Sequence, residues 1–145
     1  MINYTHNTYY EDVNVGDSIP TLTKHPTRRQ LVKWAGAARE FWEMHYDDQF
    51  AKDHGLEGVI VHGMLNNSFL CTMMLNWGGP NSMIRSFKGQ NRSIVLVDKD
   101  VVCTGTVIGK REENGAHLVD CKVKASCEGK DSVLGEITIE LPSRG

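Results

Sequence analysis

The sequence predicts an α+β fold in which one long apolar helix is buried against antiparallel strands. Two patterns indicate this fold. Residues 64–77 carry apolar side chains around nearly the whole helical cylinder, and from residue 82 onward the hydrophobic period shortens from about 3.6 to 2, the period of a strand. The chain has 145 residues, of which 40% are hydrophobic and 23% charged, so we expect residues 1–145 to form one domain with a packed core.

The first regular element expected along the chain is a helix that begins after Thr27. Residues 1–25, before it, carry turn and loop chemistry. The Thr27 hydroxyl can accept a hydrogen bond from a free amide of the first turn, and Gln30 can reach back as in a capping box. Apolar residues from Leu31 onward follow at helical spacing, so one face of this helix should contact the core.

The buried helix is expected to begin at Gly63 and to end before Gly78-Gly79-Pro80. A helix this apolar needs a sheet or another subunit around it. Its polar positions form one narrow strip, which is either exposed to water or joined by buried hydrogen bonds. The strip consists of Asn66, Asn67, Ser68 and Thr72.

The C-terminal half is expected to be a meander of half-buried antiparallel strands. Apolar and polar residues alternate in residues 119–125, and a similar period recurs in residues 133–141. Asn114-Gly115 supplies the positive φ angles of a tight hairpin turn, and residues 128–131 form the next turn. The outer strand would still have free backbone groups, so we expect the chain to dimerise through a sheet edge or face.

The net charge and the cysteine content exclude several classes of partner and site. Lysine plus arginine number 16 against 18 acidic residues, a net charge of −2 without a block of like charges, which argues against nucleic acid and an anionic membrane surface as main partners. Neither a membrane-spanning helix nor a signal peptide is expected. The four cysteines lack a C-x-x-C pair and metal-ligand spacing with the histidines, so we expect reduced thiols in a cytoplasmic protein and no metal site.

Residues 39–48 hold the densest set of acid/base groups, and Glu40 and His45 are the main candidates. A carboxylate and an imidazole that contact one water can share the removal and return of a proton. On an unbroken helix, positions five residues apart point about 140° apart, so this pair can converge only if the helix ends between them. The alternative interpretation is that Glu40 and Glu43 are solvated surface carboxylates and His45 is a helix-end or core histidine.

Gly63, within residues 58–65, is the second candidate. Free amides at the start of a buried helix, with the positive end of the helix dipole behind them, can hold a carbonyl oxygen that gains negative charge. The alternative is that Gly63 only allows close packing and that His62 is a satisfied buried histidine. Cys71, without a base beside it, and residues 88–92, which are more typical of a solvated bend than of a phosphate clamp, are weaker candidates.

Residues 40–47 and 58–65 follow one another in an arrangement that resembles the MaoC-like dehydratases, the hot-dog-fold (R)-specific enoyl-CoA hydratases. The opening segment 10–17, the helix start at Pro26-Thr27 and the closing strands are also similar to that family. The resemblance implies a single hot-dog domain, in which an antiparallel sheet wraps around the long helix. It also implies reversible addition of water to a trans-2-enoyl thioester, giving an (R)-3-hydroxyacyl thioester.

The resemblance also implies roles for individual residues. The family's aspartate, and the histidine five residues after it, fall on Glu40 and His45, and the amide that holds the thioester oxygen falls on Gly63. We therefore expect Glu40 to act as general base on the attacking water, His45 to orient that water and help return a proton, and Gly63 to stabilise the enolate. The substrate is expected to be a coenzyme A thioester, with no metal or redox cofactor. Further residues are expected in the substrate-binding pocket: Trp42, His62, Met64 and Cys71.

The chain departs from the family pattern at Glu40-Phe41-Trp42-Glu43, where the family usually has Asp-Phe-Asn-Pro. Some members without the Asn-Pro pair form one half of a heteromeric hydratase in steroid side-chain breakdown. We therefore expect either a homodimer or a heteromer with another hot-dog subunit, acting on a fatty acyl or steroid side-chain thioester. Two further functions stay open: thioester hydrolysis by water that Glu40 activates, and a non-catalytic partner subunit of a hydratase.

Overall fold

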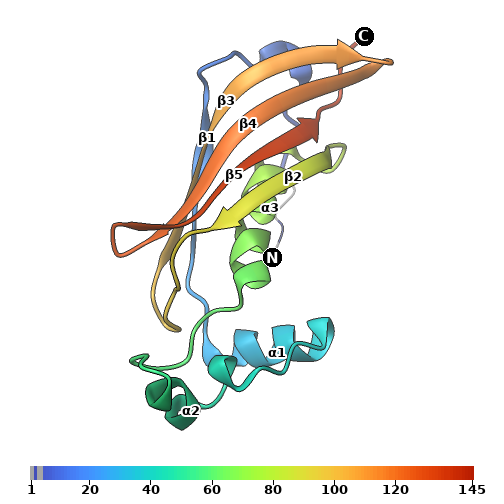
Figure 1. Cartoon of the computed structure of the whole chain (residues 1–145). Coiled ribbons are helices and arrows are strands. Elements are labelled where there is room, and N and C mark those ends of the chain that lie inside the picture. Colours follow the sequence, from blue (N-terminus) through green and yellow to red (C-terminus); the bar gives the residue numbers. More distant parts are fainter. Residues whose placement is uncertain (1, 3–4) are drawn as a thin grey trace.

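The computed structural model describes residue 2 and residues 5–145. Five strands form one antiparallel sheet in the order β1-β3-β4-β5-β2. The elements, labelled in Figure 1 where there is room, are the 3₁₀ helices η1 (Tyr10–Asp12) and η2 (Glu43–His45), the α-helices α1 (Arg28–Ala38), α2 (Asp48–Asp53) and α3 (Gly63–Gly78), and the strands β1 (Ser18–Lys24), β2 (Met83–Asn91), β3 (Val101–Glu113), β4 (Ala116–Cys127) and β5 (Lys130–Glu140).

Helix α3 lies against the curved sheet and packs on all five of its strands (Figure 1). The uniform apolar character of this helix is thereby explained, because Leu70, Met73 and Met74 are almost completely removed from solvent. Its bounds also agree with the predicted start at Gly63 and the glycine-rich stop. An antiparallel sheet wrapped around a long buried helix is a hot-dog domain, so the α+β prediction is confirmed.

The polar strip of α3 is partly internal. Ser68 Oγ donates to Leu65 O at 2.7 Å, and Thr72 Oγ1 donates to Ser68 O at 2.9 Å. Asn66 and Asn67 are both buried. Of the two alternatives for this strip, buried hydrogen bonding therefore describes it better than full exposure to water.

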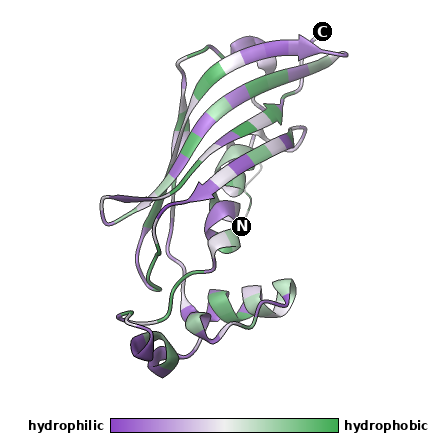
Figure 2. Ribbon diagram, in the orientation of Figure 1, coloured by the Kyte–Doolittle hydropathy of each residue, from purple (hydrophilic) through white to green (hydrophobic). Residues whose placement is uncertain are grey.

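The predicted strand alternation and hairpin turns are present. Along residues 119–125 of β4, the odd-numbered positions are buried and the two lysines between them are exposed, and Figure 2 shows the corresponding alternation of hydropathy. Asn114 and Gly115 have φ values of 52° and 83°, and Glu128 and Gly129 have φ values of 49° and 78°. These left-handed pairs join β3 to β4 and β4 to β5, as two-residue hairpin turns require.

Two segments differ from the sequence prediction. The N-terminal residues predicted as loop include β1, an edge strand that contains Pro20. The pairing of β1 with β3 shifts register between Ile19 and Leu22, and a proline without an N–H is tolerated at such an edge irregularity. Residues 88–91, predicted as a solvated bend, instead continue β2 and pair with β5.

Helices α1 and α2 and the 3₁₀ helix η2 form an overhang, residues 28–53, beyond the end of the sheet and near the start of α3 (Figure 1). The predicted cap at its beginning is present, because Thr27 Oγ1 accepts a hydrogen bond from Gln30 N at 3.3 Å. Within the described part of the chain, the helices are too short or too polar to traverse a lipid bilayer.

Candidate active site

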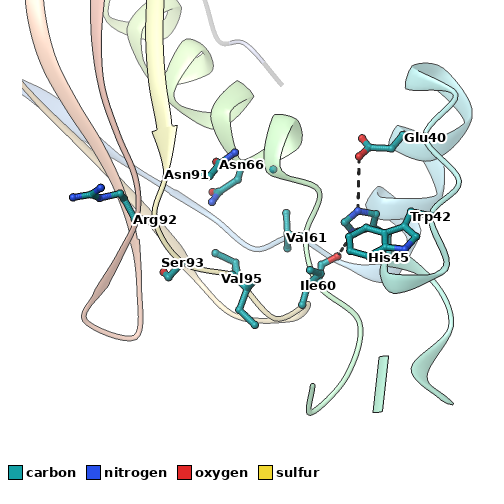
Figure 3. A pocket seen from close by; sticks show the side chains of 12 residues that line it. Glu40, Trp42, His45, Ile60, Val61, Asn66, Asn91, Arg92, Ser93 and Val95 are labelled. Atoms are coloured by element: carbon teal, nitrogen blue, oxygen red, sulfur yellow. Dashed lines mark hydrogen bonds and ion pairs between the residues drawn. The ribbon is translucent and has the colours of Figure 1, made fainter. Parts of the chain in front are cut away.

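A cavity of about 360 Å³ lies where the overhang meets the start of α3 (Figure 3). The overhang contributes Glu40, Trp42 and His45 to its lining. Helix α3 contributes Gly63 from its first turn, and the end of β2 with the segment after it, residues 91–95, closes another side. Residues far apart in the sequence thus line one open cavity beside a helix N-terminus.

Glu40 and His45 converge because α1 stops before either residue. The helix ends at Ala38, and Arg39 takes a left-handed conformation with φ 56°. The chain then runs irregularly to η2, which begins at Glu43. As a result, Glu40 Oε1 lies 3.9 Å from His45 Nε2 (Figure 3). This distance exceeds a direct hydrogen bond, yet one water about 2.8 Å from each atom can contact both.

The ring of His45 is held in one orientation. Its Nδ1 lies 2.7 Å from Ile60 O, and because a carbonyl oxygen only accepts, Nδ1 carries the proton. In the neutral form of the ring, Nε2 is then an acceptor, and it lies on the side of Glu40. The indole of Trp42 meets the imidazole edge-on, with ring centroids 5.5 Å apart. His45 is buried, so packing and this hydrogen bond together fix the acid/base geometry.

His62 lies against the other face of His45. The two imidazoles are stacked with centroids 3.8 Å apart and an interplanar angle of 20°. Burial and, to a smaller extent, the neighbouring His45 ring lower the pKa of His62, while the Glu40 carboxylate acts in the opposite direction. His62 is fully buried, its ring nitrogens make no hydrogen bond of standard geometry with the described residues, and the backbone of Glu40 is a polar group that acts on its ring.

Gly63 opens α3 with its backbone amides free of helical partners. The preceding residue, His62, makes no side-chain cap, and the hydrogen bonds of the described chain include none from the Gly63 N–H. A Cβ at this position would lie 2.9 Å from Asn91 Nδ2, so any larger residue would have to displace that side chain. A small residue therefore leaves the positive end of the helix open to an incoming oxygen atom.

Of the remaining residues predicted to bind the substrate, only Trp42 lines the cavity. His62 packs behind His45. Met64 is largely exposed, and Cys71 is half-buried midway along α3, where burial raises the pKa of its thiol; neither lines this cavity. Neither residue lies in the cavity of the single chain, so substrate binding by Met64 and Cys71 stays a prediction.

The cavity residues that sequence reasoning missed include two asparagines. Asn66 was noticed only as part of the polar strip, and Asn91 only within a segment taken for a bend. The spacing of Asn66 held a usable signal, because a residue three positions after Gly63 lies on the same helix face. Asn91 offered no comparable signal, since its place depends on the pairing of β2 with β5.

The wrapped helix defines a hot-dog protein, and a carboxylate and an imidazole share the cavity at the start of that helix. The family model described as MaoC like domain matches residues 10–128, so the chain belongs to the MaoC-like dehydratase family. No match was found among curated proteins.

Solved structures share the fold. The chain is 24% identical to the (R)-hydratase from A. caviae involved in PHA biosynthesis, with a TM-score of 0.85 over 91% of this chain and 99% of that one. It is 22% identical to R-hydratase PhaJ1 from Pseudomonas aeruginosa, with a TM-score of 0.87 over 95% of this chain and 88% of that one. A chain of the ChsH1-ChsH2 complex from Mycobacterium tuberculosis is 21% identical, with a TM-score of 0.79 over 88% of this chain and 98% of that one.

Proposed function

We propose that the protein is an (R)-specific hydro-lyase that adds water across the double bond of a trans-2-enoyl coenzyme A thioester, or removes it in the reverse direction. The main support is the convergence of Glu40 and His45 on a cavity that also contains the free helix start at Gly63. Membership of the MaoC-like dehydratase family agrees with this chemistry. The proposed step moves protons and stabilises one oxyanion, so it requires no metal or redox cofactor.

In the forward direction, a water molecule is held between the carboxylate of Glu40 and Nε2 of His45. Glu40 takes one proton as the water oxygen bonds to C3 of the enoyl group, and the electron pair of the double bond moves through C2 to the thioester oxygen. The Gly63 N–H stabilises the resulting enolate. Return of the proton to C2, with help from His45, restores the carbonyl, so one molecule of water is added in total.

The test is an assay of the purified protein with crotonyl-CoA and with a bulkier enoyl-CoA. Loss of the enoyl absorbance without release of free thiol is expected. Glu40→Gln and His45→Ala should each lower kcat/KM by at least about 10²-fold, since each removes a group that acts on the proton. Glu43→Gln is the matched control, because Glu43 is exposed and outside the cavity lining, and it should retain activity.

Two results would contradict the proposal, and a third would define its assembly. Unchanged rates in both Glu40→Gln and His45→Ala would remove these residues from the reaction. Release of free coenzyme A with the enoyl absorbance retained would identify a thioesterase. Inactivity of the pure chain, followed by activity after addition of a second hot-dog subunit, would identify one half of a heteromeric hydratase.

A hot-dog partner, either a second copy or a related subunit, is part of the proposal. Its support is the free outer edge of β2 in the sheet and the structural likeness to a chain of a two-component complex. Light scattering of the purified protein distinguishes a monomer from a dimer. We also propose a cytoplasmic location, which suits four free thiols, of which Cys103 and Cys121 have their pKa raised to about 12 by burial.

A further inference from the structure

Asn66 is a buried polar residue in the cavity lining that the proposed chemistry does not use. It is 4% exposed and follows Gly63 by three positions on the same face of α3. Its Nδ2 donates to Ser132 Oγ at 3.0 Å, whereas its Oδ1 has no hydrogen-bond partner in the described part of the chain. An unpaired buried acceptor destabilises the free protein, so a function is the expected reason for keeping this oxygen unpaired.

The orientation of the Asn66 amide is fixed from the side of the sheet. Ser132 is fully buried, and its hydroxyl donates to Ala125 O at 3.1 Å. A hydroxyl has only one hydrogen, so Ser132 Oγ must accept from Asn66, and the Nδ2 branch of the amide must face Ser132. The Oδ1 branch is therefore held away from Ser132, and this oxygen is itself almost completely buried in the free chain.

A second carboxamide lies at the same end of the cavity. Asn91 is the last residue of β2, and its Nδ2 lies close enough to the helix start to crowd a Cβ on Gly63. Figure 3 shows Asn66 and Asn91 beside the first turn of α3. Because Asn91 is exposed, its side chain can turn aside when a ligand enters, which gives that ligand access to the buried amide.

We propose that Asn66 determines specificity by accepting, through Oδ1, a hydrogen bond from an O–H or N–H group of the thioester; this inference rests on the proposed binding of a thioester at Gly63. Three residues of α-helix rise by about 4.5 Å, so the donor belongs about that far from the thioester carbonyl. Two groups meet this requirement: a hydroxyl on the fifth acyl carbon, and the first amide N–H of the pantetheine arm. A ligand with neither group leaves Oδ1 unpaired and binds more weakly.

The test measures affinity by NMR titration with saturated thioesters, so that it does not depend on turnover. One matched pair is 5-hydroxyhexanoyl-CoA and hexanoyl-CoA; the other is hexanoyl-N-acetylcysteamine and its N-methylated analogue, which lacks only the N–H. The natural protein should bind the donor-bearing member of one pair about tenfold more tightly, and Asn66→Leu should abolish that preference. The first pair identifies an acyl hydroxyl as the donor, and the second identifies the pantetheine amide.

Two further variants keep the test decisive. Asn67→Leu is the matched control, because Asn67 is also a buried asparagine with an unpaired Oδ1 but does not line the cavity, and it should keep the preference. Ser132→Ala leaves residue 66 intact and should weaken the preference by releasing the amide. If Asn66→Leu fails to fold, the Ser132→Ala result decides.

Absence of preference in both pairs, or a preference that survives in Asn66→Leu, overturns the inference. Asn66-dependent preference in a protein that hydrates no enoyl thioester contradicts only the proposed function. Hydration without the preference contradicts only the role of Asn66. Failure to bind any of the four ligands overturns both.

Discussion

The two hydrophobic clusters of the molecule differ in size and in what they support. The larger cluster fills the space between α3 and the sheet, where Leu70 and Ile139 are completely buried. The smaller cluster consists of Met44, Ala51 and Ile60, with three partly buried neighbours. The first holds α3 on the sheet and also includes Leu31 of α1, whereas the second packs η2 against α2 beside His45. We therefore expect overall stability to depend mainly on the first cluster and the position of His45 mainly on the second.

The largest expected effect is on the larger cluster. Leu70→Ala should lower the free energy of unfolding by about 2–5 kcal/mol, because it leaves a cavity between α3 and the sheet. Urea denaturation followed by circular dichroism measures this change. Ile108→Ala, at an exposed position of β3, is the control and should change stability by no more than about 0.5 kcal/mol. Equal effects of the two substitutions would contradict the importance of this cluster.

The smaller cluster should affect activity more than stability. Met44 is buried beside His45, and its backbone carbonyl accepts a hydrogen bond from Ile60 N at 3.1 Å. Met44→Ala should loosen the overhang and displace His45, so hydration should fall by about 10²-fold. The loss of unfolding free energy should stay below that of Leu70→Ala.

The readouts for Met44→Ala are the hydration rate and hydrogen exchange of residues 43–53. Faster exchange in this segment alone is expected, since the sheet is supported elsewhere. Val32→Ala, an exposed position of α1, is the control. Normal activity of Met44→Ala, or loss of protection throughout the sheet, would show that the two clusters are not independent.

The smallest expected effect is the pH dependence that His62 contributes. Burial lowers the pKa of His62 from its ordinary value of 6.5. As the pH falls below that value, the unfolded chain binds a proton at this residue before the folded protein does, so stability decreases. His62→Phe keeps a flat ring against His45 and removes the titration.

The check on His62 is a comparison of unfolding midpoints at about pH 7 and about pH 5. The natural protein should lose more stability over this interval than His62→Phe does. Both proteins carry the same other titrating groups, so the difference reports the loss of His62 together with its coupling to Glu40 and His45. Parallel decreases in the two proteins would show that burial of this imidazole does not contribute.

The sequence contained enough information for the core helix and for most of the sheet. The apolar cylinder after Gly63 and the alternation in residues 119–125 report burial directly, because each follows the period of one element. Thr27 and the two left-handed turn pairs are local signals of similar quality. These features depend on residues that are neighbours in sequence.

The site was less accessible to this kind of reasoning. The convergence of Glu40 and His45 depends on a left-handed arginine, Arg39, and neither glycine nor proline marks that break. The stack of His45 on His62 and the bond from Asn66 to Ser132 join separate segments, so they depend on the folded arrangement. For Glu40, His45 and Gly63 only the family resemblance favoured the functional interpretation over the alternative.

The link from Asn66 through Ser132 to Ala125 runs between α3 and the strands β5 and β4, none of which carries Glu40 or His45. On the proposed role of Asn66, substitution at these positions changes which ligands are favoured, while Glu40 and His45 keep their own supports. Divergence among relatives could then alter substrate choice by one or two exchanges in the interior, without rebuilding the chemistry. On this proposal, the residues that select the ligand and the residues that react with it can evolve at different rates.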